Sequence, residues 1–155
     1  MTKNNSHADN QSLTMTELMT PNMVNFNGTV HGGYILGLLD RVAWACAARY
    51  SGKSLVTLSV DQVVFKEPIY VGELVTFYAS VNYVGRTSLE VGIRVVAENL
   101  KNNQSRHTNT CYLTMVAVDE NLKPTPVKPL VIHNETEQRR YDEAIARKEM
   151  RLRGK

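Results

Sequence analysis

Hydrophobic positions divide the chain into a helical part and a strand-rich part. Between residues 32 and 50, apolar side chains recur at the spacing of about 3.6 residues that is typical of one amphipathic helix. Gly52 follows this run and is a natural C-terminal cap. Beyond it the period falls to two, as where Leu89, Val91 and Ile93 alternate with other residue types. The pattern therefore predicts one long helix followed by strands.

Five segments have the composition and spacing of strands. They are one short run at 13–19 and four long runs rich in Val, Thr, Tyr and Ile at 56–65, 74–84, 88–100 and 107–118. The connectors between the long runs are centred on Glu67-Pro68, Gly85-Arg86 and Asn102-Asn103. Because short connections join antiparallel neighbours, each long strand is expected beside the next one. The predicted fold class is α+β, with the helix covering one face of an antiparallel sheet.

The two ends of the chain differ from this domain, which we place at residues 13–122. Residues 1–12 are polar and rich in Asn and Ser, and we expect a disordered tail. Residues 123–134 contain prolines and should form an extended linker, followed by a basic helix at 135–155. That helix has acidic and arginine residues four apart, such as Glu143 and Arg147. It is either a solvated helix docked lightly on the domain or a basic arm near a phosphate.

Composition narrows the possible classes of protein. Of the net charge of +3, two charges belong to residues 135–155, so the rest is close to neutral and does not suggest a broad nucleic-acid surface. The longest apolar run, residues 42–48, is too short to span a bilayer, and the N-terminus lacks a secretion signal. Cys46 and Cys111 fit buried thiols in a reducing compartment. We therefore expect a cytoplasmic protein with neither a nucleic acid nor a membrane as partner.

One carboxylate, Asp40, lies within the apolar helix. On a helical wheel it shares its side with Leu36, Ala43, Trp44 and Ala47, where packing is expected. Burying an unpaired carboxylate is costly, so such a group is paired, protonated or functional. An ion pair with an arginine or a position at a subunit boundary would explain Asp40. A role as general base is the alternative, and the helix alone does not favour it.

The residues before the helix bear on this choice. Gly32 and Gly33 leave the backbone N–H groups of a helix N-terminus open, at the positive end of the helix dipole. Such a place can hold a carbonyl oxygen as it gains negative charge, although a tight turn and close helix packing also call for glycine. Asn25 adds an amide that could orient a water or a substrate. Amide donors two helical turns from a carboxylate suit hydrolysis at an acyl carbon.

The segment PNMVNFNGTVHGGYILGLLD, residues 21–40, resembles the signature of the hotdog-fold acyl-CoA thioesterases, the acyl-CoA hydrolase family. That signature has an Asn, a Gly, a His-Gly-Gly or Phe-Gly-Gly triplet, and an acid seven residues after the last of these glycines. The matching residues here are Asn25, Gly28, His31, Gly32, Gly33 and Asp40. The resemblance continues through residues 63–75 and 83–91 and covers residues 15–118.

The resemblance implies a hotdog fold, in which a five-stranded antiparallel sheet wraps around one long helix. It also implies a homodimer with active sites at the shared boundary, assembling into a homohexamer. The implied activity is hydrolysis of acyl-CoA to free CoA and a carboxylic acid, in fatty acid metabolism. No metal and no cofactor are expected, since CoA is part of the substrate and product.

The resemblance also implies roles for particular residues. Asp40 would be the catalytic acid, acting as general base on water or as nucleophile. Asn25, often supplied across the dimer, would position the water or thioester, and the backbone N–H of Gly32 would polarise the carbonyl. The implied substrate-binding residues are His31, Gly33, Val84, Gly85, Arg86, Thr87 and Ser88. Among them Arg86 is the best phosphate contact, although a turn residue could equally be solvated.

A second class of function fits the same fold, namely a non-catalytic regulator that binds acyl-CoA or CoA. Such a protein would be expected to lose the acid or to gain a DNA-binding segment, whereas this chain keeps Asp40 and Asn25. A hydratase on this fold would call for an Asp/His pair in one loop, which the sequence does not show. The sequence therefore favours the enzyme.

Overall fold

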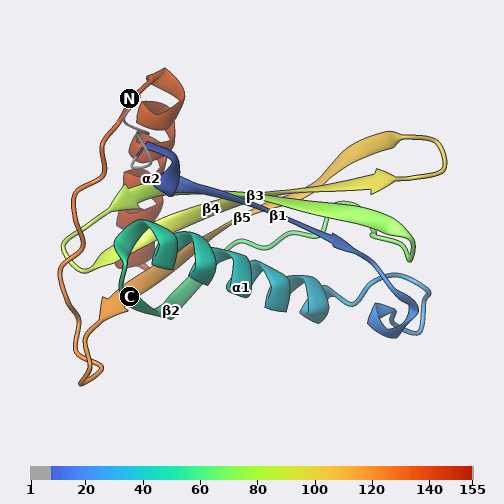
Figure 1. The fold of residues 1–155 in the computed structure, drawn as a ribbon, viewed down its shortest axis with the longest axis horizontal. Coiled ribbons are helices and arrows are strands. Elements are labelled where there is room, and N and C mark those ends of the chain that lie inside the picture. Colours follow the sequence, from blue (N-terminus) through green and yellow to red (C-terminus); the bar gives the residue numbers. More distant parts are fainter. Residues whose placement is uncertain (1–7, 155) are drawn as a thin grey trace, which may run out of the picture.

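The structure is a computed structural model, and it describes residues 8–154. The elements are η1 (Ala8–Gln11), β1 (Ser12–Leu18), η2 (Pro21–Met23), α1 (Gly32–Ser51), β2 (Ser54–Asp61), β3 (Glu73–Val84), β4 (Ser88–Asn99), β5 (Gln104–Val118) and α2 (Glu135–Arg153). The long helix α1 runs along one side of the sheet, and α2 stands at one end of it (Figure 1). No helix in this part of the chain is long and apolar enough to cross a membrane.

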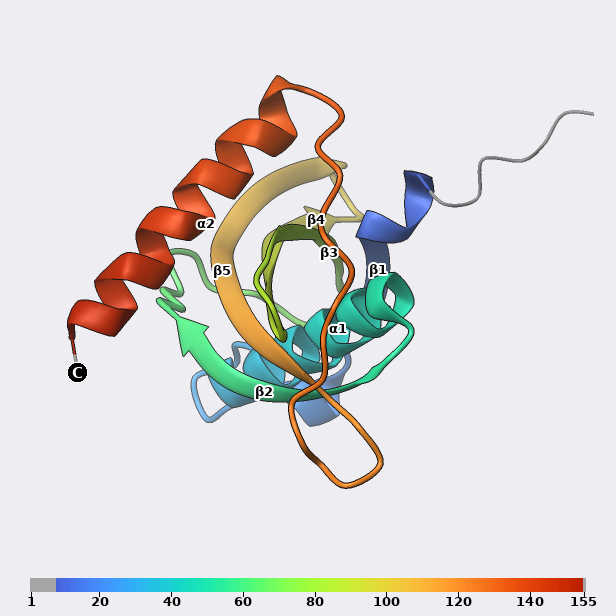
Figure 2. The ribbon, with the colours of Figure 1, turned by 90° about the vertical axis from the view of Figure 1, so that its left-hand side faces the viewer.

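The strands form one antiparallel sheet in the order β1-β3-β4-β5-β2. Figure 2 shows the sheet curling around α1, which confirms the predicted hotdog architecture. The expectation that each long strand pairs with the next is wrong for β2 and β3. The strand β2 pairs with β5 at the edge, whereas β3 pairs with β1 and β4. Residues 62–72 join them, and this segment is long enough to cross beneath the start of α1.

The hydrophobic core lies between α1 and the inner face of the sheet. Alternate residues of the central strands, such as Phe77, Ile93 and Leu113, are fully buried there, as a period of two requires. On α1 the buried side chains are Ile35, Leu38, Leu39, Val42, Ala43, Cys46, Ala47 and Tyr50. The helix ends as predicted, because Gly52 adopts a left-handed conformation with φ of 67°.

Several boundaries differ from those predicted. Residues 8–11 form η1 and Ser12 begins β1, so the predicted disordered tail is wrong for residues 8–12. The rest of that tail, residues 1–7, lies outside the described residues. The strand β2 ends at Asp61, because Gln62 takes a positive φ of 47° that interrupts the extended backbone. Phe65, placed in a strand by its sequence pattern, therefore belongs to the connector.

The C-terminal helix α2 packs on the outer face of the sheet through charged groups. Arg147 donates to both carboxylate oxygens of the buried Glu90, at 2.7 and 3.0 Å. Arg151 pairs with Asp61 at 3.0 Å. The expected pair of Glu143 with Arg147 does not form, since Arg147 turns to the sheet and Glu143 lies instead 3.6 Å from Arg139. The helix is thus anchored to the domain by ion pairs.

Candidate active site

A short loop before α1 is held together by the side chain of Asn25. Its Oδ1 accepts hydrogen bonds from the backbone amides of Asn27, at 2.8 Å, and Thr29, at 3.2 Å. Its Nδ2 lies 3.0 Å from the hydroxyl of Thr29. This is the turn-forming use of asparagine, in which the side chain replaces a backbone acceptor. Asn25 therefore fixes the loop that delivers the chain to α1.

The N-terminus of α1 begins with Gly32 and Gly33, which have no side chains of their own to cover the backbone amides. His31 is the N-cap, is exposed, and makes no side-chain capping bond. Its carbonyl accepts from the amides of Tyr34 and Ile35, and the amides of Gly32 and Gly33 lie in the turn that lacks intrahelical acceptors. These amides and the helix dipole together make this end electrostatically favourable for a partly negative oxygen.

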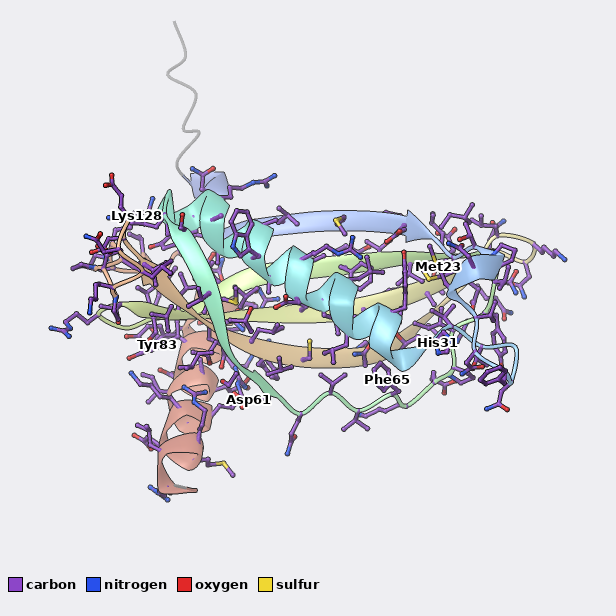
Figure 3. All side chains as sticks on the ribbon, turned by 90° about the horizontal axis from the view of Figure 1, so that it is seen from below. Met23, His31, Asp61, Phe65, Tyr83 and Lys128 are labelled. Atoms are coloured by element: carbon purple, nitrogen blue, oxygen red, sulfur yellow. The ribbon has the colours of Figure 1, made fainter. Side chains whose placement is uncertain are left out.

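Phe65, from the β2–β3 connector, lies directly against Gly32. A Cβ atom at that position would sit 3.3 Å from the phenyl ring, closer than side chains ordinarily pack. Figure 3 places Phe65 beside His31 at the beginning of α1. A side chain at position 32 would therefore require the Phe65 ring to shift by a few tenths of an ångström, whereas glycine accommodates the ring where it lies.

Asp40 is exposed in the single chain, so the packing expected from the helical wheel is only partly correct. Ala43 and Ala47 are buried, but Leu36 and Trp44 on the same side of the helix are exposed. The carboxylate Oδ1 of Asp40 accepts a hydrogen bond of 2.6 Å from the hydroxyl of Thr57 on β2. Thr57 was not singled out by the sequence, because only the packing of β2 against α1 brings it to Asp40.

The predicted site residues do not come together within one chain. Gly32 and Asp40 are eight positions apart on α1, which corresponds to about 12 Å along the helix axis. The turn at residues 84–88 lies at the far end of β3, a strand of 12 residues whose other end is near the start of α1. At roughly 3.3 Å per residue, these two ends are separated by more than 30 Å.

At that far end, the turn between β3 and β4 is closed by a 2.8 Å hydrogen bond from the Gly85 amide to the Ser88 carbonyl. The carbonyls of Arg86 and Thr87 accept amides from Val127 and Ala117, while the Arg86 side chain is exposed. These hydrogen bonds use the backbone of Arg86 and not its guanidinium. The exposed guanidinium could therefore contact a phosphate. Val84, also predicted to bind substrate, is buried beneath the turn.

Lys148 adds a second cation near this turn. Its ammonium lies 3.3 Å from the hydroxyl of Tyr83, the residue before Val84. Sequence reasoning missed Lys148 because it belongs to α2, whose docking position is set by the pairs with Glu90 and Asp61. Arg86 and Lys148 are thus two cationic side chains at this end of the sheet.

Exposed apolar side chains surround Asp40 and Thr57. Leu36 and Trp44 flank Asp40 one turn before and after it, and β2, at the edge of the sheet, exposes Val56, Leu58 and Val60. An edge strand with exposed apolar side chains is normally covered by another part of the protein or by a partner molecule. The surface around Asp40 therefore has the character of an interface.

The two cysteines contribute no reactive group to this region. Both are buried, and burial raises the pKa of the Cys46 and Cys111 thiols to about 12. A thiol with so high a pKa stays protonated and is a poor nucleophile. Among the residues that the structure describes, no three His, Cys, Asp or Glu side chains gather as metal ligands would.

Comparisons with known proteins agree on one family. Residues 27–102 match the family model of the thioesterase superfamily. The chain is 56% identical over 147 residues to protein VdlD of Helicobacter pylori, covering 95% of this chain and 84% of that protein. It is 34% identical over 132 residues to the uncharacterized acyl-CoA thioester hydrolase YkhA of Bacillus subtilis, covering 85% of this chain and 77% of YkhA.

Solved structures show the same fold. An apo-hexameric acyl-CoA thioesterase superposes with a TM-score of 0.88 at 39% identity, covering 92% of this chain and 91% of the other. The acyl-CoA hydrolase of Staphylococcus aureus, in complex with butyryl-CoA, CoA and CoA disulfide, superposes with a TM-score of 0.84 at 30% identity, covering 91% and 86%. The S. aureus structures include variants with one Asn, one Asp or one Thr changed to Ala.

Proposed function

The chain belongs to the thioesterase superfamily, among its acyl-CoA hydrolases, and we propose that it hydrolyses acyl-CoA to CoA and a carboxylic acid at a site containing Asp40. The hydrogen bond between Thr57 and Asp40 carries this proposal. In this chain Asn25, Asp40 and Thr57 are separated by 15 and 17 positions. The Asn, Asp and Thr substituted in the S. aureus hydrolase are separated by the same two intervals. The common spacing supports a common role.

The chemistry follows from the groups at each end of the site. The amide of Gly32 would donate to the thioester oxygen as it gains charge. Thr57 holds Oδ1 of Asp40 and leaves Oδ2 available to take a proton from water or to attack the acyl carbon itself. With Asp40 as general base, water adds to the acyl carbon as Oδ2 takes its proton, and the C–S bond then breaks; with Asp40 as nucleophile, the C–S bond breaks as an acyl anhydride forms, and water then hydrolyses the anhydride and restores the carboxylate. In both routes the CoA thiolate leaves and takes up a proton.

The active site would be assembled from two chains. One thioester carbon cannot contact both the Gly32 amide and an Asp40 about 12 Å further along the same helix. A two-fold pairing with antiparallel α1 helices would bring the partner's Asp40 beside Gly32 and Asn25. The exposed Leu36, Trp44 and β2 side chains would be buried by this pairing. We propose a homodimer that assembles further into a homohexamer, the state named for one similar structure.

The turn at residues 84–88 would reach CoA from a neighbouring chain. CoA carries phosphates, and Arg86 and Lys148 supply the positive charge that they require. His31, Gly33, Gly85, Thr87 and Ser88 would contact the substrate through their backbone or short side chains. No cofactor beyond the CoA of the substrate takes part in this proposal.

The first test is CoA release from a panel of acyl-CoAs by wild type and Asp40→Asn. We expect kcat to fall by at least about 100-fold, since a general base typically contributes that much or more. Asp142→Asn, on the exposed side of α2, is the matched control and should keep wild-type activity. An active Asp40→Asn would contradict the assigned role. A wild type that binds CoA esters without releasing CoA would instead be the non-catalytic regulator.

The two-chain site is tested by mixing inactive variants. Asn25→Ala and Asp40→Asn subunits, unfolded and refolded together, should regain about a quarter of wild-type activity, because half of the pairs are mixed and each has one intact site. If both residues acted within one chain, no mixture would be active. The size of the assemblies, measured by light scattering, must match wild type.

A further inference from the structure

A cavity of about 330 Å³ opens beside the Gly32 amide. Its floor is apolar and buried, formed by Val30, Ile35 and Ile69, and Phe65 forms one wall. Thr29, Glu67 and Pro68 lie at its margin. The cavity thus begins at the Gly32 amide, where a thioester oxygen would be held, and its deeper part is lined by apolar side chains.

The walls of this cavity are fixed by the fold. The amide of Val30 donates to the carbonyl of Ile69 at 2.8 Å, and Thr29 bridges to Tyr70. On the other side, Arg106 donates to the carbonyl of Pro68, and the Tyr70 amide donates to Glu73 at 2.8 Å. The connector is therefore bonded to the rest of the sheet on both flanks of the cavity.

Phe65 differs from the other walls because it is 49% exposed, whereas Val30, Ile35 and Ile69 are buried. Its ring lies against Gly32. A large aromatic side chain at the rim of an apolar cavity limits what can extend past it. Its removal should enlarge the cavity without emptying the core.

We infer that this cavity binds the acyl chain of the substrate and that Phe65 limits the length of that chain. The inference rests on the proposed hydrolase function. The cavity is small and ends at the buried Val30, Ile35 and Ile69, so it takes only a limited length of acyl chain. The substrates are accordingly short- to medium-chain acyl-CoAs. Longer chains bind with their ends in water and gain nothing from the added length.

The inference is tested by binding rather than by turnover. S-alkyl-CoA thioethers with chains from C4 to C16 cannot be hydrolysed, and their dissociation constants can be measured by calorimetry. In wild type the affinity should rise by up to about fourfold per buried methylene and then level off at a chain length within this series. Phe65→Ala should move the plateau to longer chains, and Phe65→Trp should move it to shorter ones.

Val64→Ala is the matched control, because Val64 is the exposed apolar neighbour and does not line the cavity. Its plateau should equal that of wild type. An unchanged plateau in both Phe65 variants, with normal folding and assembly, would overturn the inference, as would affinities independent of chain length in wild type.

The same proteins are assayed for CoA release from acyl-CoAs, which separates the two proposals. Length-dependent thioether binding with the expected shifts, but no CoA release, would refute the hydrolase and support the acyl cavity. Hydrolysis with an identical chain-length profile in all four proteins would support the hydrolase and refute the role of Phe65.

Discussion

The two faces of the sheet are covered by two helices in two different ways. On the inner face, alternate residues of β4 such as Val91 and Ile93 are fully buried against the apolar side of α1. On the outer face, Glu90 is also buried, but its partner is Arg147 of α2. Arg147 lies in turn over the ring of Tyr112, 3.5 Å from its centroid.

The two faces therefore contribute differently: the inner face stabilises the fold, and the outer face sets the position of α2. Apolar burial is non-directional and grows with the area removed from water, so the inner face stabilises the fold as a whole. A bidentate arginine–carboxylate pair depends on geometry, and its net contribution is small once desolvation is counted. The outer face therefore determines where α2 lies, and with it the position of Lys148 near the turn at residues 84–88.

The largest expected effect comes from the inner face. Phe77→Ala removes a fully buried ring and should lower the free energy of unfolding by about 3–5 kcal/mol. The neighbouring Tyr78 points to the outer face and is 50% exposed, so Tyr78→Ala should cost clearly less. Urea denaturation of both variants measures the difference. Equal losses would show that the two faces contribute alike.

A smaller and more local effect is expected on the outer face. Arg147→Ala leaves Glu90 without its charged partner, and we expect a loss of about 1.5–3 kcal/mol, the value of hydrogen bonds to a charged group. Because α2 is an end segment, the loss should appear as undocking of that helix before global unfolding. Limited trypsin digestion, which cleaves after the arginines of α2, would detect it.

The matched variant replaces both members of the pair. Glu90→Gln with Arg147→Met removes the buried charges together and should recover much of the stability lost in Arg147→Ala. If the double variant is as sensitive to trypsin as the single one, the helix requires the ion pair itself. If Arg147→Ala is no more sensitive than wild type, α2 is held by its other contacts.

The inner face could be predicted from sequence and the outer face could not. Alternation in residues 88–100 and the helical spacing of residues 32–50 reflect burial in hydrocarbon, which selects residue type directly. Glu90 gives no such signal, because an exposed glutamate and a buried, paired one look alike in a sequence. The partner of Arg147 was therefore expected within the helix, four residues away, rather than on the sheet.

Some residues of the candidate site could be predicted from the sequence, and others could not. Asn25, the glycines at the start of α1 and Asp40 lie within one short segment, so their spacing could be recognised directly in the sequence. Thr57 and Phe65 lie further along the chain and reach α1 only because β2 pairs with β5 and sends its connector under the helix. Their positions beside α1 depend on that long-range pairing, which the short-connector rule did not predict.

A further carboxylate tests whether the inner layer is purely apolar. Glu73, at the end of the inner face of β3, is buried and accepts from Arg106, at 2.7 Å to Oε1, and from the Tyr70 amide. Burial alone would raise the pKa of Glu73, but the hydrogen bonds from Arg106 and Tyr70 outweigh it and lower that pKa below its ordinary value.

The smallest predicted effect is the pH dependence that follows from this shift. A carboxyl group whose pKa is lower in the folded state stabilises the fold above its unfolded pKa, near 4.3, and this contribution is lost as the pH falls through the folded pKa. Glu73→Gln should therefore be less stable than wild type at pH 7, with the gap narrowing below about pH 4. For Phe77→Ala the gap should stay constant over the same range, because no proton is involved. Urea denaturation from pH 7 to pH 3 measures both, and a constant gap for Glu73→Gln would mean that the Arg106 pair gives the folded state no net advantage.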